Sequence, residues 1–167
     1  RSCRSNRSDG GYRCGGNRSN RPRWTHWTHR SYHEIPFLWR FHAVHHSAKT
    51  MDWLAGSRLH VGEVLITRTL VLAPIYVLGF SKEVIDVYIV LVGFQAVFNH
   101  ANVSVRLGPL RYLIVTPNFH HWHHSQDQAA LDRNYAAHFA FLDHLFGTAV
   151  KSDQLWPKDY GVLGDYV

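Results

Sequence analysis

The sequence contains little cysteine, and its two cysteines, Cys3 and Cys14, both lie close to the N-terminus. Their spacing fits neither a CxxC redox pair nor a zinc knuckle. Acidic residues are also scarce, with 12 Asp and Glu against 18 Lys and Arg, which gives a formal net charge of +6. The sequence has no GxGxxG fingerprint, P-loop or serine nucleophile elbow. It therefore gives no support for a flavin or nicotinamide enzyme, a P-loop nucleotide enzyme or a serine hydrolase.

The N-terminal segment 1–23 is almost wholly Arg, Ser, Gly and Asn. Such a composition cannot bury a core, so we expect a disordered basic tail. The segment lacks the apolar core of a signal peptide. A basic tail could contact anionic lipid or nucleic acid, but we interpret it as solvated and expect no nucleic-acid partner. We expect one domain over 24–150 and a loose C-terminal tail over 151–167.

Histidine is abundant in the part of the sequence that follows the two cysteines and contains none. Of the 14 histidines, nine fall in an HxxxH box, two HxxHH boxes and the segment FNHANV. These nine candidate metal ligands are His29, His33, His42, His45, His46, His100, His120, His123 and His124. If each box is helical, its imidazoles share one face. Pro36 is expected to restart the helix before the second box, and Thr116 followed by Pro117 predicts a helix start before the third.

The donor set favours a site for two metal ions. Imidazole suits zinc, copper, iron and nickel, and two ions sharing a site need about this many nitrogen donors. Structural zinc usually has four ligands, often thiolates, and no cysteine lies near the boxes. The Glu-x-x-His spacing of soluble di-iron bundles is absent as well. We therefore predict a dinuclear, redox-capable site held by nitrogen.

Two apolar segments, Val64 to Phe80 and Val84 to Phe98, separate the second box from the third. Each is short against the roughly 20 residues of a full span, but a tight helical hairpin fits them. The alternative is two buried helices of a soluble bundle. If both segments enter the membrane together, the chain returns to the face it left and brings His100 beside the first boxes. The basic N-terminal region places the metal site on the cytoplasmic side under the positive-inside rule.

The boxes and their surroundings, HRSYHEIPFLWRFHAVHHS, DWLAGSRLH, FNHANV, TPNFHHWHHS and DRNYAAHFAFLDHLFGT, resemble the fatty acid hydroxylase superfamily of membrane di-iron oxygenases, which includes the sterol desaturases. The resemblance runs from about Trp27 to Thr148. It implies an all-α, multi-pass integral membrane protein whose nine histidines hold two iron ions. It also implies O2 as co-substrate, hydroxylation or desaturation of a lipid C–H bond in lipid biosynthesis, and an external electron donor such as a cytochrome b5, a ferredoxin or a reductase.

The sequence departs from the family pattern at Ala96, where relatives usually carry another histidine four residues before His100. His60 or His138 could supply a tenth ligand, while His26 and His121 are left outside the ligand set. Ligating histidines need an acceptor for their second nitrogen. The carboxylates available for this are Glu34, Asp52, Glu63, Asp127, Asp132 and Asp143.

Three alternatives to an active oxygenase stay open. One is a zinc metallohydrolase, although catalytic zinc usually keeps three protein ligands. Another is a non-catalytic metal-binding membrane protein. The third is an inactive truncated family member, because the resemblance implies apolar helices before the first box and the sequence shows none.

Overall fold

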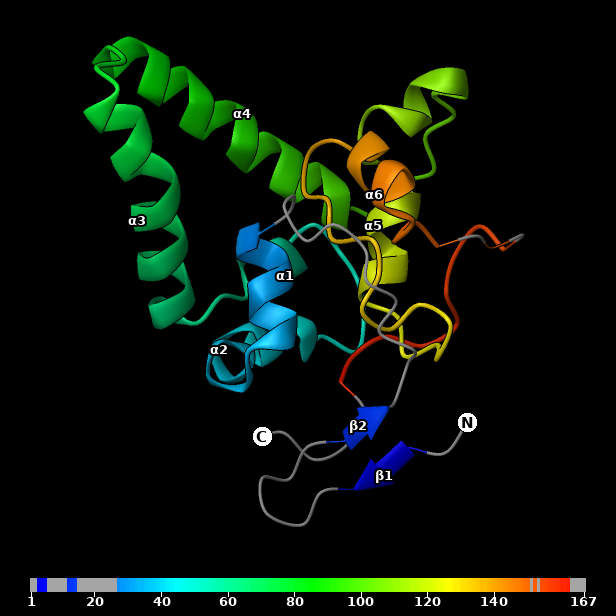
Figure 1. Ribbon diagram of the computed structural model, residues 1–167. Helices are drawn as coiled ribbons and strands as arrows, with labels where there is room; N and C mark the ends of the chain where they lie inside the picture. The colour runs from blue at the N-terminus through cyan, green and yellow to red at the C-terminus, as the bar shows by residue number, and fades with distance from the viewer. Residues whose placement is uncertain (1–2, 6–11, 15–26, 151, 153, 163–167) are drawn as a thin grey trace.

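The computed structural model describes residues 3–5, 12–14, 27–150, 152 and 154–162. Its elements, in chain order, are β1 (Cys3–Ser5), β2 (Tyr12–Cys14), α1 (Trp27–Glu34), α2 (Pro36–His46), η1 (Ala55–Ser57), α3 (Val61–Val77), α4 (Lys82–His100), η2 (Gly108–Tyr112), α5 (Pro117–His123) and α6 (Phe141–Phe146) (Figure 1). From α1 onward every named element is helical, as expected. In the segment expected to be disordered, β1 and β2 form a short antiparallel pair.

The two predicted helix starts are confirmed. Pro36 occupies the first position of α2, directly after the end of α1 at Glu34 and the intervening residue Ile35. Thr116 caps α5, where its side chain accepts a hydrogen bond from the backbone N–H of Phe119 at 3.3 Å. These local signals place the second and third histidine boxes on helices, with α1 packed against α2 and the end of α4 packed against α5.

The apolar segments form α3 and α4, but the prediction of a tight hairpin is wrong. The helices diverge from their turn in an open V (Figure 1). The reason is that the start of α3 is held by α2, whereas the end of α4 is held by α5 and η1. Apolar side chains along both helices are left exposed, among them Leu65 on α3 and Phe94 on α4.

Among the described helices, α4 alone is long and apolar enough to cross a membrane. Helix α3 has only 17 residues and is not long enough to count as a second such helix. A multi-pass topology is therefore not confirmed. The alternative of two buried helices in a soluble bundle does not fit either, because only 11% of the apolar stretch of α4 is buried within the described structure. The predicted return does occur, since α4 ends at His100 beside the histidines of the first boxes.

The interior of the molecule is built around polar side chains. In the described part of the chain the buried apolar residues include two small clusters, one of Ala48, Met51 and Ala55 and the other of Val115, Ala136 and Ala140. Among the described residues, eight of the fourteen buried polar side chains are histidines, and six of these belong to the two HxxHH boxes. Because buried polar groups need partners, the histidine arrangement is the feature that the rest of the fold has to satisfy.

Residues 154–162, expected to be part of a loose tail, are instead held against the domain. The backbone N–H of Gln126 donates to the carbonyl of Asp159 at 3.1 Å, and that of Gly161 donates to the carbonyl of His124 at 3.2 Å. Tyr160 also packs against the cluster around Met51. We call this segment the C-terminal strap.

Candidate metal centre

Five of the predicted ligands form a first cluster. They are His29 and His33 from α1, His42 and His46 from α2, and His123 from α5, and one ligand atom of each lies within 4.8 Å of the others. The Nε2 atom of His29 lies 3.0 Å from the Nε2 atoms of both His42 and His123. His33 Nε2 lies 3.2 Å from His123 Nε2, and His46 Nε2 lies 3.1 Å from His42 Nε2. The five Nε2 atoms therefore converge on one small volume.

The remaining four predicted ligands, His45, His100, His120 and His124, form a second cluster. The Nε2 atom of His100 lies 3.2 Å from that of His45 and 3.1 Å from that of His120, which in turn lies 3.2 Å from His124 Nε2. The two clusters adjoin, because the rings of His46 and His124 stack with centroids 4.3 Å apart. All nine predicted residues are thus brought together, in groups of five and four.

The second ring nitrogens of five cluster histidines point outward to hydrogen-bond acceptors, whereas Nδ1 of His120 and of His124 has no partner within the described structure. Backbone carbonyls accept from Nδ1 of four of them: Tyr135 from His29 (2.8 Å), Arg133 from His123 (2.8 Å), Ala96 from His100 (2.7 Å) and Arg58 from His45 (3.2 Å). A carbonyl oxygen can only accept, so Nδ1 carries the proton in these rings. Their Nε2 atoms therefore present lone pairs to the inside of the clusters.

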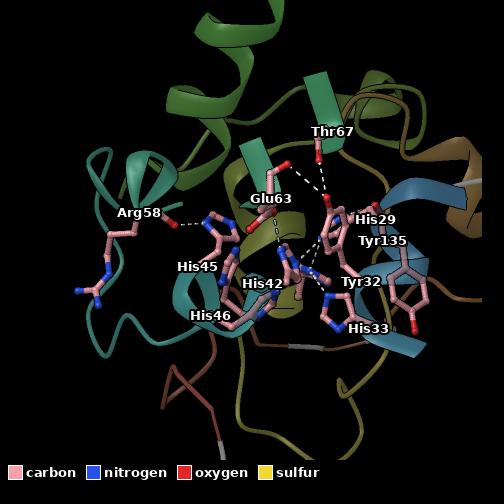
Figure 2. A network of polar contacts seen from close by, with 12 residues as sticks. His29, Tyr32, His33, His42, His45, His46, Arg58, Glu63, Thr67 and Tyr135 are labelled. Atoms are coloured by element: carbon pink, nitrogen blue, oxygen red, sulfur yellow. Dashed lines mark hydrogen bonds and ion pairs between the residues drawn. The ribbon is translucent and has the colours of Figure 1, made fainter. Parts of the chain in front are cut away.

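One carboxylate joins this outer layer at close range. Glu63, in the first turn of α3, accepts a hydrogen bond from His42 Nδ1 at 2.8 Å (Figure 2). Glu63 is buried, and its other oxygen, Oε2, has no hydrogen-bond partner within the described structure. Asp132 is the other candidate carboxylate near a cluster, with Oδ1 3.6 Å from His33 Nδ1, but its side chain is largely exposed. Of the six carboxylates considered, Glu63 is therefore the one that makes a buried hydrogen bond to a histidine of the clusters within the described structure.

The arrangement fits bound cations. Nε2 lone pairs that face one another at about 3 Å repel unless a positive ion lies between them. Burial and neighbouring imidazoles hold the pKa of His29, His33 and His46 well below the usual value. Burial lowers the pKa of His123 to about 3. The rings are therefore neutral at pH 7, which is the form that binds a metal.

The residues considered for a tenth ligand do not join either cluster. His60 caps α3, where its Nδ1 accepts from the backbone N–H of Gly62 at 3.0 Å. His138 Nδ1 lies 3.0 Å from Gln95 Oε1. His26 lies outside the described residues. The residue four positions before His100 is Ala96, and the second cluster contains four imidazoles.

Sequence reasoning did not assign Asp143 its structural role. This fully buried carboxylate accepts hydrogen bonds from the backbone N–H groups of Tyr135 at 3.1 Å and Ala136 at 2.7 Å, and from the hydroxyl of Thr148. It thereby holds the loop that presents the Tyr135 carbonyl to His29. The sequence carried no signal for this contact beyond a carboxylate in the first turn of a short helix.

The fold and the site together define a helical protein with two adjoining, buried histidine clusters, each of which could hold a metal ion. The model of the family described as fatty acid hydroxylase matches residues 21–148. The chain therefore belongs to the fatty acid hydroxylase family.

Curated relatives agree with this assignment. The chain is 35% identical to the ornithine lipid hydroxylase OlsE of Rhizobium tropici, over 81% of this chain and 41% of that protein. It is 30% identical to the alkylglycerol monooxygenase of Homo sapiens, over 74% of this chain and 27% of that protein. A very-long-chain aldehyde decarbonylase of Oryza sativa is 29% identical over 78% of this chain and 22% of its own length. The chain thus spans less than half of each of these relatives, and no solved structure matches it significantly.

Proposed function

We propose that this chain is the metal-binding part of a membrane-associated di-iron oxygenase that hydroxylates or desaturates a C–H bond of a lipid. The observation that carries the proposal is the convergence of nine histidine Nε2 atoms in two adjoining buried clusters, in a chain of this family. In this proposal the first iron is held by the five histidines of the first cluster. The second iron is held by the four histidines of the second.

The donor set is compatible with iron and argues against a zinc hydrolase with a single ion. The clusters contain only imidazole, which suits iron and copper as well as zinc. A zinc hydrolase keeps about three protein ligands and an open position, and nine donors exceed what one such ion can use. When bound, iron would supply O2 activation and the oxidation of an unactivated C–H bond.

The protein's own residues position the ligands and exclude water. The Nδ1 contacts to the carbonyls of Tyr135, Arg133 and Arg58 fix the orientation and tautomer of three rings. Glu63 does the same for His42, with a negative charge that makes this ring a stronger donor. Because the histidines of α2 and α5 are almost fully buried, bulk water is kept away from the site of oxidation.

A lipid substrate is supported by the relatives and by the exposed apolar helices. Two relatives are named for ornithine lipid and alkylglycerol, and α3 and α4 expose apolar side chains that a bilayer would cover. In this arrangement the clusters lie on the cytoplasmic side. Hydroxylation places one oxygen atom of O2 in the product and releases the other as water, and this consumes two electrons and two protons. An external electron donor such as a cytochrome b5, a ferredoxin or a reductase would supply the electrons.

The test is metal analysis and O2 uptake of detergent-purified protein loaded anaerobically with ferrous iron. We expect about two irons per chain and O2 consumption that rises when a lipid and a reductant are added. His123→Ala removes a ligand of the first cluster and His45→Ala one of the second, so each variant should lose about one iron. His144→Ala is the matched control, because this histidine is exposed and belongs to neither cluster.

The other outcomes identify the alternatives. Zinc at about one ion per chain with no O2 uptake would contradict the oxygenase and favour a metallohydrolase. Two irons without lipid-stimulated O2 uptake would contradict catalysis and favour a non-catalytic or inactive metal-binding protein.

A further inference from the structure

We propose that the C-terminal strap, through Tyr160 and His121, positions the ligands of the second cluster and so determines how tightly that cluster holds its metal ion. The inference rests on the proposed metal binding. The strap lies outside the residues that the family model matches, and the nine predicted ligands do not include His121.

The strap lies across the two helices that carry the HxxHH boxes. On the side of α5, Ser125 and Tyr160 form an isolated β-bridge, and the Gln126 side chain donates to the Tyr160 carbonyl at 3.1 Å. On the side of α2, the Tyr160 ring packs against Ala48 and Met51, which follow the end of that helix. The strap therefore ties together the ends of α2 and α5, where the ligands lie.

His121 is the link between the strap and the second cluster. It is fully buried between the Trp156 ring, with centroids 4.6 Å apart, and two polar partners. Its Nδ1 lies 2.9 Å from the Tyr160 hydroxyl, and its Nε2 lies 3.2 Å from the backbone carbonyl of His100. Because a carbonyl can only accept, Nε2 carries the proton and Nδ1 must accept from the Tyr160 hydroxyl. By donating to Nδ1, the Tyr160 hydroxyl therefore stabilises the tautomer of His121 that donates to the His100 carbonyl.

The strap reaches two ligands of the second cluster, His100 through His121 and His124 through Gly161. His100 is the last residue of α4 and the only ligand from that helix, so its carbonyl fixes where its ring enters the cluster. A second contact runs from the Gly161 N–H to the carbonyl of His124 at 3.2 Å. The described partners of the first-cluster rings of His29 and His42 are Tyr135 and Glu63, which do not belong to the strap. Loss of the Tyr160 hydroxyl alone keeps the packing of the strap on α2 and α5, so it is expected to act through His121 and His100 on the second metal and not on the first.

The experiment measures metal retention and does not depend on catalysis. Wild-type protein and Tyr160→Phe are loaded anaerobically with ferrous iron and titrated with EDTA, and the iron remaining on the protein is counted. We expect Tyr160→Phe to release one iron per chain at up to about 10-fold lower EDTA concentration, the low end of the effect of removing a partner behind a metal ligand, because Tyr160 acts through His121 and not on a ligand ring directly. The other iron should be released as in wild type.

Two comparisons assign the effect. In a His45→Ala background, which disables the second cluster, adding Tyr160→Phe should not change release of the remaining iron. His121→Gln keeps an N–H donor near the His100 carbonyl, so it should retain the second iron better than His121→Ala does. Tyr112→Phe is the control, because the Tyr112 hydroxyl contacts the exposed Arg111 away from the clusters.

The possible failures are distinguishable. Wild-type protein with two irons, and a Tyr160→Phe variant that releases both as wild type does, would overturn this inference alone. Equal weakening of both irons would overturn it too, because it would show a general effect on folding. Wild-type protein without any bound iron would overturn the proposed function and this inference with it.

Discussion

Replacing Glu63 with glutamine should weaken the first metal site and leave the second unchanged. Glu63 Oε1 accepts the His42 Nδ1–H at 2.8 Å, inside the protein and with the carboxylate charge behind the contact. A buried hydrogen bond to a charged group contributes about 1.5–3 kcal/mol. The glutamine oxygen can still accept from His42 Nδ1, and a hydrogen bond to a neutral acceptor contributes about 0.5–1.5 kcal/mol, so the loss is about 1–1.5 kcal/mol. Since 1.4 kcal/mol corresponds to tenfold in affinity, Glu63→Gln should lower the affinity for the first metal about tenfold.

The glutamine fills the same volume, so no cavity is created. Its amide nitrogen would take the place of Oε2, which has no partner within the described structure, and an unpaired buried donor is unfavourable. Removal of a buried charge instead stabilises the folded protein. We therefore expect the melting temperature of the metal-free protein to change less than the metal affinity does.

The assay is the EDTA titration of iron-loaded protein, with Glu83→Gln as the matched control because that glutamate is exposed in the first turn of α4. In Glu63→Gln, one iron per chain should leave at lower EDTA concentration. Adding His123→Ala, which disables the first cluster, should abolish the difference. Release of both irons together, or release as in wild type, would refute the reasoning that Glu63 supports His42 as a ligand.

Three further predictions concern pH, a buried carboxylate and the membrane. Unfolding the metal-free protein exposes cluster histidines such as His123, whose pKa rises from about 3 in the fold to about 6.5. Below about pH 6.5 the unfolded chain then binds more protons than the folded chain. The free energy of unfolding should therefore decrease by up to about 1.4 kcal/mol for each such histidine and each unit by which the pH is lowered. Melting temperatures that do not change between pH 7.5 and 5.5 would contradict this. Asp143→Asn should lower the melting temperature by turning an N–H donor toward the backbone donors of Tyr135 and its neighbour, at a cost of about 1–3 kcal/mol; an unchanged melting temperature would contradict it. Val90→Arg, in the middle of α4, should release the protein from membranes in a carbonate wash, because arginine at the centre of a span costs about 2.5–3.5 kcal/mol; Val103→Arg, an exposed site beyond α4, should not.

The histidine clusters could be predicted because their information is local. HxxxH and HxxHH spacing places imidazoles on one face of a helix, and Pro36 and Thr116 mark where two of those helices begin. The position of His100 was predicted on the condition that both apolar segments enter the membrane together. His100 does lie beside the boxes, although α3 and α4 open into a V and not a tight hairpin (Figure 1). These inferences needed no knowledge of which side chains meet across the core.

The partners of the ligands could not be predicted in the same way. Glu63 is 21 residues from His42, and Tyr160 is 39 residues from His121. Six carboxylates were available, and their roles depend on how α3, α6 and the strap pack, which no local pattern specifies. The strap itself has a composition that indicates a tail, and it is held by contacts to α5 that appear only in the folded chain. The open angle between α3 and α4 was missed for the same reason, because it depends on which neighbours hold the far ends of the two helices.

The HxxHH box explains how one short helix can contribute side chains to both histidine clusters. Successive residues of a helix point about 100° apart, so the adjacent histidines of a box face in different directions. In α2, His46 points to the first cluster and His45 to the second, and at the end of α5, His123 and His124 divide in the same way. The first histidine of each box lies on the same face as one of the pair and reinforces it: His42 joins His46, and His120 joins His124.

Both boxes therefore contribute to both clusters, and neither cluster can form without α2 and α5 together. The stacked rings of His46 and His124 lie where the clusters meet, so a shift of either helix would move ligands of both metals at once. This shared construction separates two kinds of change. Removal of one box histidine should cost the metal of its own cluster, and a change in a partner that reaches one cluster only, such as Glu63 or Tyr160, should weaken that metal alone. A change that displaces α2 or α5 should weaken both metals.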